Sequence, residues 1–356
     1  MRILLRRLGT ALLFLAVAFC FAPALVPPLL DRIYYQGPVS DHFDGRRFFN
    51  PEDRTGPPMK VNPARFFNRW AKGEGRAKWP NSVPVTPTVP PRRVDGQRMM
   101  VTWIGHSTVL VQTAGLNILT DPIWAERASP FSFIGPRRVR APGVRLEDLP
   151  KIDLILVSHN HYDHMDLATL KRLWERDRPA IVTSLGNDTI LRHAGIASRA
   201  LDWGGATRVG SAEVVVEPVH HWGSRWGTDR NRALWSGFTV RLNGGNLFFA
   251  GDTGYGGGAW ASQDAKDGPY RLAILPIGAY APRDVMSGNH MDPDEAVDTF
   301  RRLGARTALG VHWGTFQLTF EPIGDPPLRL AAALKRAGIA PQRFVATEVG
   351  RSFVVP

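Results

Sequence analysis

The 356-residue chain is nearly free of cysteine, since Cys20 is the single one. One thiol excludes an intramolecular disulfide framework and a cysteine-rich zinc ribbon or finger. Acidic residues are also scarce: 32 Asp and Glu stand against 44 Lys and Arg, so the formal net charge is +12. This excess suggests a polyanionic partner, either nucleic acid or an anionic membrane surface. Apolar residues make up 44% of the chain, which excludes wholesale disorder.

The positive charge is concentrated in the first hundred residues. Residues 1–100 contain 16 basic and 7 acidic side chains, whereas residues 101–356 contain 28 and 25. The larger part of the chain is therefore nearly neutral, which argues against a general binder of polyanions. We accordingly expect no nucleic-acid partner.

An uncharged run from Leu8 to Leu30 follows three arginines at the N-terminus. As a helix rising 1.5 Å per residue, the run could span the ~30 Å hydrocarbon core of a bilayer. We predict that residues 1–30 form a membrane anchor, with a cleaved signal segment or a buried helix as alternatives. The arginines outnumber Arg32 beyond the run. By the positive-inside rule the rest of the chain then faces the periplasm from a bacterial inner membrane.

Residues 31–99 form a basic arm ahead of the main domain, which we expect to comprise residues 100–356. Five prolines between Pro80 and Pro91 predict an extended connector within the arm. The aromatic residues of the arm either dock on the main domain or lie on an anionic lipid surface.

From Met100 onward, short apolar runs alternate with amphipathic segments, which predicts an α/β or α+β fold with helices covering sheets. The expected strands are Val101–Ile104, Thr108–Gln112, Leu116–Leu119, Leu154–Val157, Ala180–Thr183, Glu213–Val219, Gly237–Leu242, Leu247–Ala250, Leu272–Pro276 and Thr307–Val311. The expected helices are Leu167–Trp174, Pro293–Leu303 and Pro327–Ala337.

The strongest chemical signal is the segment Ser-His-Asn-His-Tyr-Asp-His at residues 158–164, directly after a predicted buried strand. Imidazole and carboxylate groups suit zinc and related divalent metals. In an extended segment His159 and His161 point to the same side, so both can bind one ion. Asp163 and His164 follow as the chain turns into a helix, and they can reach a second ion.

Further candidate ligands follow other predicted strands. His220 and His221 end the strand Glu213–Val219, while Asp252 and His312 follow two later strands. Each of them alone is an ordinary turn former or packed side chain. Their shared placement at strand ends is what indicates one common cleft.

Taken together, these motifs resemble the metallo-β-lactamase superfamily and, within it, the N-acylphosphatidylethanolamine-hydrolysing phospholipase D family. The resembling stretches lie in the same order over residues 100–350: VTWIGHSTVLV, LTDPIWAERASPFSFIGPRR, LPKIDLILVSHNHYDHMD, HHWGSR, FFAGDTGY, PIGAYAPR, HMDPDEA and VHWGTF. The resemblance implies a metallo-β-lactamase-like αββα sandwich that holds two zinc ions.

The resemblance also implies a ligand set. Three histidines would hold one zinc ion, namely His159, His161 and His221. The other ion would be held by Asp163, His164 and His312. Asp252 would bridge both ions. Asp121 matches a superfamily aspartate that orients a ligand histidine, with a simple turn former as the alternative. The family usually has glutamine where this chain has His220, so His221 is the expected ligand and His220 the alternative.

The implied reaction is the hydrolysis of a phosphodiester. A hydroxide held between two zinc ions is a strong nucleophile near neutral pH, and no side-chain nucleophile is signalled. We assign catalytic roles to Asp163 and His290. His290 either assists the leaving group or caps the helix that begins near Pro293. Three arginines, Arg137, Arg138 and Arg140, either steer phosphate or are exposed, solvated charges.

For the substrate, the family implies an N-acylated phosphatidylethanolamine, cleaved to phosphatidic acid and N-acylethanolamine. The expected partners are this membrane phospholipid and an anionic membrane surface, and a homodimer stays open. Three other functions also stay open: a hydrolase of a soluble lactone or phosphodiester, an RNA nuclease, and a metal-binding scaffold without catalysis. The nearly neutral main domain argues against the nuclease, and the nearly complete ligand set argues against the scaffold.

Overall fold

The computed structural model describes residues 6–18, 32–55, 68–69 and 71–356. Residues 6–18 are helical. None of the helices within these described ranges is both long enough and apolar enough to cross a membrane. Residues 19–30 of the predicted anchor lie outside the described residues, so the anchor stays a prediction.

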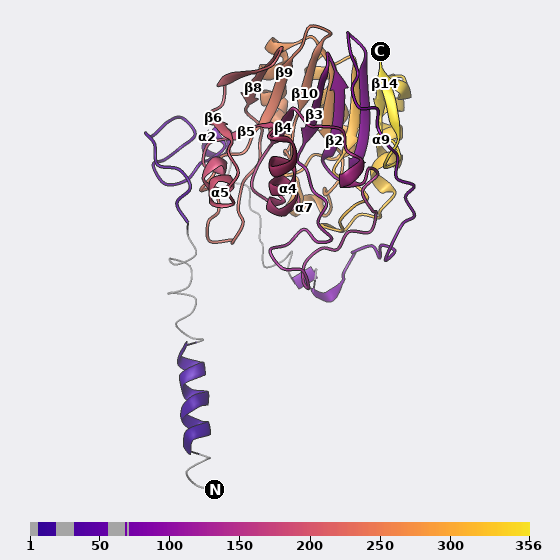
Figure 1. The fold of residues 1–356 in the computed structure, drawn as a ribbon. Helices are drawn as coiled ribbons and strands as arrows, with labels where there is room; N and C mark the ends of the chain where they lie inside the picture. Colours follow the sequence, from indigo (N-terminus) through magenta and orange to yellow (C-terminus); the bar gives the residue numbers. More distant parts are fainter. Residues whose placement is uncertain (1–5, 19–31, 56–67, 70) are drawn as a thin grey trace.

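Two seven-stranded sheets form the centre of the fold (Figure 1). The first has the strand order β14-β1-β2-β3-β4-β5-β6 and the second the order β13-β12-β11-β10-β9-β8-β7. The strands of the first sheet are β1 (Met99–Gly105), β2 (Thr108–Thr113), β3 (Leu116–Thr120), β4 (Leu154–Val157), β5 (Ala180–Ser184), β6 (Arg199–Leu201) and β14 (Ser352–Val355). Those of the second are β7 (Ala206–Val209), β8 (Ala212–Glu217), β9 (Gly237–Arg241), β10 (Asn246–Phe249), β11 (Tyr270–Pro276), β12 (Thr307–Val311) and β13 (Phe344–Val345).

Strand β4 explains why the first sheet needs cover on both faces. Leu154 and Leu156 belong to the large core that includes residues of both sheets, whereas Ile155 and Val157 belong to a second, smaller core. Successive side chains of a strand point to opposite faces, so a continuous apolar run is stable only when both faces are buried.

Helices provide that cover on both sides of the sandwich. On the first sheet, α4 (Leu167–Asp177) and α5 (Asn187–His193) complete the smaller core (Figure 1). On the second sheet, α8 (Pro293–Arg302) and α9 (Asp325–Arg336) join the large core. The layers are therefore helix, sheet, sheet, helix, as the resemblance implied. Shorter helices are α2 (Pro51–Thr55), α6 (Ala259–Asp264) and α7 (Arg283–Met286).

All the strands and helices predicted for the main domain are present, with ends shifted by three residues at most. The elements that were missed are short and lie mainly at the edges of the sheets. They are β6, β7, β13, β14, α5, α6 and α7. An edge strand buries little of its surface, so its apolar pattern is weak.

The described part of the arm packs against the main domain, which was one of the two alternatives for its aromatic residues. Phe43 and Phe48 are each 1% exposed and belong to the large core. The indole Nε1 of Trp79 donates a hydrogen bond of 2.8 Å to the backbone oxygen of Glu321. Residues 80–91 form neither helix nor extended ladder, as the prolines predicted.

Six of the strands that end at one edge of the sandwich lead into histidines or aspartates. In the first sheet β1, β3 and β4 run in the same direction, because β1 and β3 both pair antiparallel with β2 and β3 pairs parallel with β4. In the second sheet β8, β10 and β12 likewise share one direction. The segments that follow these strands carry the candidate ligands.

Candidate metal centre

The connection between β4 and α4 supplies four of the candidate ligands. Backbone N–H groups of His164 and Met165 donate to the carbonyl of His161, so the chain turns tightly after that residue. The turn brings His164 back to His159, with 4.2 Å between their ring centroids. The two imidazoles of His159 and His161 approach closely, with Nε2 of the first 2.9 Å from Nδ1 of the second.

His159, His161 and His221 form the first ligand group, in which one ligand atom of each lies within 4.8 Å of the others. The Nδ1 of His221 lies 2.9 Å from the backbone oxygen of Asn289. A carbonyl oxygen only accepts, so Nδ1 carries the proton and Nε2 keeps its lone pair. The Nε2 atoms of His161 and His221 are buried and have no hydrogen-bond partner among the described residues.

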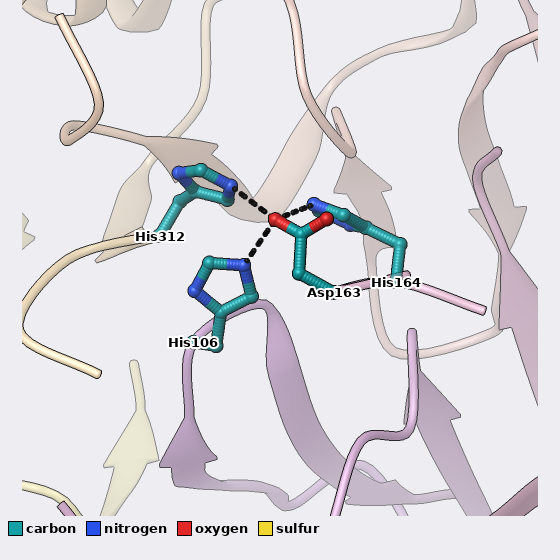
Figure 2. Close-up of side chains that lie close together, drawn as sticks. All are labelled: His106, Asp163, His164 and His312. Carbon is teal, nitrogen blue, oxygen red and sulfur yellow. Dashed lines mark hydrogen bonds and ion pairs between the residues drawn. The ribbon is translucent and has the colours of Figure 1, made fainter. Parts of the chain in front are cut away.

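The second ligand group contains Asp163, His164 and His312, and a further histidine, His106. Figure 2 shows three imidazoles directed at one carboxylate oxygen of Asp163. The Nε2 atoms of His164 and His312 each lie 3.5 Å from Asp163 Oδ2, and that of His106 lies 3.0 Å away.

Asp252 lies between the two groups. Its Oδ2 is 3.1 Å from Nε2 of His164, 3.0 Å from Nε2 of His312 and 3.9 Å from Nε2 of His221. The preceding Gly251 has a φ of 61°, and a Cβ there would lie 2.5 Å from the side chain of Ser158. Only glycine lets the chain approach the β4–α4 connection closely enough to insert Asp252.

Asp121 holds one of the histidines in place. It is fully buried at the end of β3, and its carboxylate accepts from the backbone N–H (2.7 Å) and the hydroxyl (2.6 Å) of Ser158. The same carboxylate lies 2.7 Å from Nδ1 of His164, which leaves Nε2 of that ring facing Asp252. This contact favours the orienting role over that of a simple turn former.

The histidines of the first group are kept neutral by their surroundings. Burial lowers the pKa of His159 and His221 well below the usual value, and it lowers the pKa of His161 to about 4. Neutral imidazole is the form that binds metal ions.

In the second ligand group, the pKa values of two histidines are raised instead of lowered. Burial opposes charge on His164, but the negative charges of Asp252 and Asp163 outweigh it and raise the pKa of His164. The same carboxylates raise the pKa of His312 to about 9. In turn, burial alone would raise the pKa of Asp163 and of Asp252, but the charge of His164 keeps both well below the usual value. Positive charge thus gathers around the two carboxylates.

This donor set fits divalent metal ions. Buried ring nitrogens of His161, His221 and His312, and Oδ1 of Asp252, have no hydrogen-bond partner in the described part of the chain. Native proteins rarely leave so many buried polar atoms unpaired. A cation between them would satisfy their lone pairs, and imidazole with carboxylate is the ligand chemistry of zinc and related metals.

The structure separates the two adjacent histidines that the sequence left open. His220 points toward the arm, with its Nε2 3.3 Å from Asp53 Oδ1, and it does not join either ligand group. His221 does join the first group. The geometry therefore favours His221.

His290 lies beside the centre, with its Nδ1 3.9 Å from Asp252 Oδ2. Helix α8 is capped by Asp292, whose side chain accepts from the backbone N–H groups of Asp294 and Glu295. The alternative role for His290 as the cap of this helix is therefore wrong. Burial lowers the pKa of His290 to about 4.

The three arginines of the Arg137–Arg140 segment differ from one another. Arg138 is 6% exposed and donates to the backbone oxygens of Ala125 and Ile123, so it braces a loop and is not a solvated charge. Arg140 is partly buried over the ring of Trp313, whereas Arg137 is exposed.

His106 is the residue of this centre that the sequence analysis missed. Its ring is 1% exposed, and its backbone is fixed by bonds from His106 N–H to Thr315 Oγ1 and from the Trp103 indole to the His106 carbonyl. Its φ of 53° is unusual for a residue other than glycine. His106 lies two residues after the strand predicted at Val101–Ile104, so the strand-end placement that identified the other ligands could have found it.

Known proteins resemble this chain in both sequence and fold. A profile described as the beta-lactamase superfamily domain matches residues 116–313. The chain is 33% identical over 349 residues to N-acyl-phosphatidylethanolamine-hydrolyzing phospholipase D 1 of Caenorhabditis elegans, covering 92% of this chain and 97% of that protein. It is also 33% identical over 258 residues to the mitochondrial N-acyl-phosphatidylethanolamine-hydrolyzing phospholipase D of Saccharomyces cerevisiae, covering 70% of this chain and 55% of that protein.

Solved structures share the fold at low sequence identity. An isothiocyanate hydrolase from Delia radicum gut bacteria superposes with a TM-score of 0.56 at 20% identity, over 72% of this chain and 98% of that chain. The metallo hydrolase Igni18 from Ignicoccus hospitalis gives 0.54 at 21% identity, over 73% and 99%. These likenesses concern the two-sheet fold alone.

Proposed function

The chain belongs to the metallo-β-lactamase superfamily and, within it, to the N-acylphosphatidylethanolamine-hydrolysing phospholipase D family, and on that premise we propose its substrate and products. As a metal-dependent hydrolase, it would cleave N-acylphosphatidylethanolamine to phosphatidic acid and N-acylethanolamine. The observation that carries the proposal is the convergence of both ligand groups on Asp252, in a chain that matches a relative of that activity over almost its whole length.

We propose that the centre holds two zinc ions. His159, His161 and His221 would bind one, and Asp163, His164 and His312 the other, with Asp252 shared between them. Metal ions bound here would supply an activated water near neutral pH and neutralise charge on a phosphate oxygen.

The residues around the ligands fix their orientation. The Asn289 carbonyl holds the proton of His221 at Nδ1, and Asp121 does the same for His164, so that both Nε2 atoms face the centre. Such partners of a ligand raise its basicity and define its direction.

The proposed step consumes one water molecule. Its oxygen forms a bond to phosphorus, and the bond from phosphorus to the ethanolamine oxygen breaks. The leaving oxygen takes a proton and departs as N-acylethanolamine, while phosphatidic acid remains. We assign to His290, which lies beside Asp252, the transfer of the proton lost by the attacking water to the leaving oxygen.

One arginine close to the candidate ligands suits a phosphate-bearing substrate. The guanidinium of Arg230 lies 4.1 Å over the ring of Trp222, which contacts the partly exposed His161 at 4.3 Å between ring centroids. An arginine held in this way presents its charge at a fixed position.

The proposed location follows the same premise. We propose that the uncharged run from Leu8 to Leu30 anchors the protein in a bacterial inner membrane, with the main domain in the periplasm. The arginines before the run support this orientation, and the phospholipase name of a relative supports a location at a membrane.

The test is to incubate the purified, zinc-loaded protein with mixed phospholipid vesicles and to identify products by mass spectrometry. We expect N-acylethanolamine and phosphatidic acid to form together, with no release from Asp252→Asn. Release of choline or of fatty acid would contradict the headgroup assignment. Hydrolysis of short phosphodiesters or lactones, with none of vesicle phospholipid, would favour the soluble-substrate alternative.

A further inference from the structure

Exposed apolar side chains gather on one loop between β3 and β4. Phe131, Phe133 and Ile134 are 48%, 77% and 58% exposed. Two more exposed apolar residues, Trp226 at 38% and Ile33 at 55%, come from other parts of the chain. Soluble surfaces usually carry such residues singly, and a contiguous group marks an interaction site.

The loop holds these side chains outward by specific contacts. Arg127 donates from Nε to the carbonyl of Ser132 (3.0 Å) and from Nη1 to the carbonyl of Gly135 (2.7 Å). At the base of the loop the backbone N–H of Ala128 donates to the carbonyl of Pro136. The exposure of the phenylalanines therefore belongs to an ordered loop, whose two rings lie 5.5 Å apart.

A surface pocket of about 320 Å³ joins this loop to the other two segments. Pro130 of the loop, Trp226 of the β8–β9 connection and Tyr34 of the arm all line it. Tyr162 lines the same pocket, and it stands in the chain between the candidate ligands His161 and Asp163. The pocket contains none of the candidate ligands, but through Tyr162 the apolar surface adjoins the β4–α4 connection that carries four of them.

Basic side chains accompany the apolar ones. The guanidinium of Arg32 lies 5.8 Å from the ring of Trp226, and Arg137 at the foot of the loop is exposed. Arg32 also follows the uncharged run predicted as the anchor, so the chain enters the folded body at this same surface. Aromatic and aliphatic tips with arginines beside them match the interface of an anionic bilayer.

We propose that Phe131, Phe133, Ile134, Trp226 and Ile33 form a lipid-docking surface that inserts into an anionic bilayer and turns the metal centre toward the headgroups. The substrate delivered there rests on the proposed function, but insertion is independent of hydrolysis. The surface accounts for how a buried centre meets a substrate that does not leave the membrane.

The test places a fluorescent reporter within the loop of the full-length chain. Cys20→Ser removes the single native thiol, and Ser132→Cys then carries an environment-sensitive dye. The matched control is Ser211→Cys, in the turn between β7 and β8 at the opposite edge of the sandwich. Vesicles contain phosphatidylcholine and phosphatidylglycerol with brominated acyl chains, which quench only a dye that enters the bilayer.

We expect a blue shift and several-fold stronger quenching at position 132 than at position 211. The double substitution Phe133→Ser with Ile134→Ser should reduce quenching at 132 to the control value, although the N-terminal run is unchanged. Omission of phosphatidylglycerol should weaken quenching, because the arginines then lose their attraction to the surface.

Equal quenching at both positions would overturn the proposal. So would a dimer in vesicle-free buffer that the double substitution dissociates, without any quenching, since the surface would then bind a second copy of the chain. Insertion without hydrolysis of N-acylphosphatidylethanolamine would instead reject the proposed substrate and leave the docking surface standing.

Discussion

The metal centre and a second group of acidic residues shift the pKa values of their carboxyl groups in opposite directions. The acid group consists of Glu217 at the end of β8, Asp264 at the end of α6, and Asp267 nearby. Burial raises the pKa of Glu217 to about 7, and burial with the charge of Glu217 raises the pKa of Asp264 to about 9. In the metal centre, by contrast, the pKa values of Asp163 and Asp252 are lowered.

Burial alone does not distinguish the two groups. Asp252 is 2% exposed and Asp264 is 0% exposed, and each has a carboxylate oxygen without a hydrogen-bond partner in the described chain. The difference lies in the neighbours, because imidazoles surround Asp252 whereas other carboxylates surround Asp264. A buried carboxylate remains charged, and able to bind a cation, only where its surroundings supply positive charge.

The largest expected effect separates the two groups by activity. Asp252→Asn should reduce kcat/KM by about a thousandfold or more, since the metal's contribution to a phosphoryl reaction is several kcal/mol. Asp264→Asn should leave kcat/KM unchanged. Steady-state kinetics on vesicle substrate measures both, with circular dichroism as the control for folding. Similar losses of kcat/KM in the two variants would contradict the assignment of Asp252, but not Asp264, to the metal centre.

The next effect concerns metal-dependent stability. Saturating zinc at about 100 to 1,000 times its Kd should stabilise the wild type by roughly 3–4 kcal/mol. Thermal unfolding with and without a chelator measures this gain. It should persist in Asp264→Asn and be strongly reduced in Asp252→Asn. A gain that persists undiminished in Asp252→Asn would mean that the metal binds elsewhere.

A smaller effect should appear in the acid group, and it depends on pH. The folded state raises the pKa of Asp264 to about 9, so it binds this proton more tightly than the unfolded state does. The contribution of Asp264 to the free energy of unfolding is therefore largest at acidic pH. It declines as the pH rises toward about 9.

Asparagine does not ionise, so Asp264→Asn should be more stable than the wild type by about 1–3 kcal/mol at pH 8. Chemical denaturation at pH 5 and at pH 8 should show that this difference grows with pH. A difference that is constant or shrinks would mean that Asp264 is already charged in the folded protein.

The smallest expected effect tests the histidine that contacts Asp163. Replacing His106 by Leu removes the hydrogen bond to that carboxylate and should weaken binding of the second metal by about 10- to 100-fold. His106→Gln retains a donor and should recover part of the affinity. Competition with a chromophoric chelator measures both sites separately. His42→Gln, a buried histidine in the arm, provides a matched control with no expected change.

The fold was predictable wherever an element buries an apolar run. Strands β4 and β12 were predicted at their observed bounds, because every residue in them is buried and the run ends abruptly in polar residues. The edge strands β13 and β14 were not, since β13 has two residues and two of the four residues of β14 are exposed. Their position depends on contacts with distant strands.

The site was predictable where side chains carry the chemistry. The motif at residues 158–164 identified one side of the centre, and strand ends identified Asp252 and His312. The carbonyl of Asn289, which orients His221, was not predictable, because every residue has a carbonyl and only the fold determines which one lies there. His106 lies between these cases, since its placement was visible but its contact with Asp163 was not.

One contact of the arm also bears on how the protein folds. Asn50 accepts from the backbone N–H of His221 and donates to its carbonyl, and so links residues that are 171 positions apart. Loop closure over such a separation is slow compared with local folding. During synthesis the arm emerges early and must wait for its partner. Docking of the first-made segment onto the ligand loop therefore belongs to the slow, long-range steps of folding, and we expect hydrolytic activity to appear only after it.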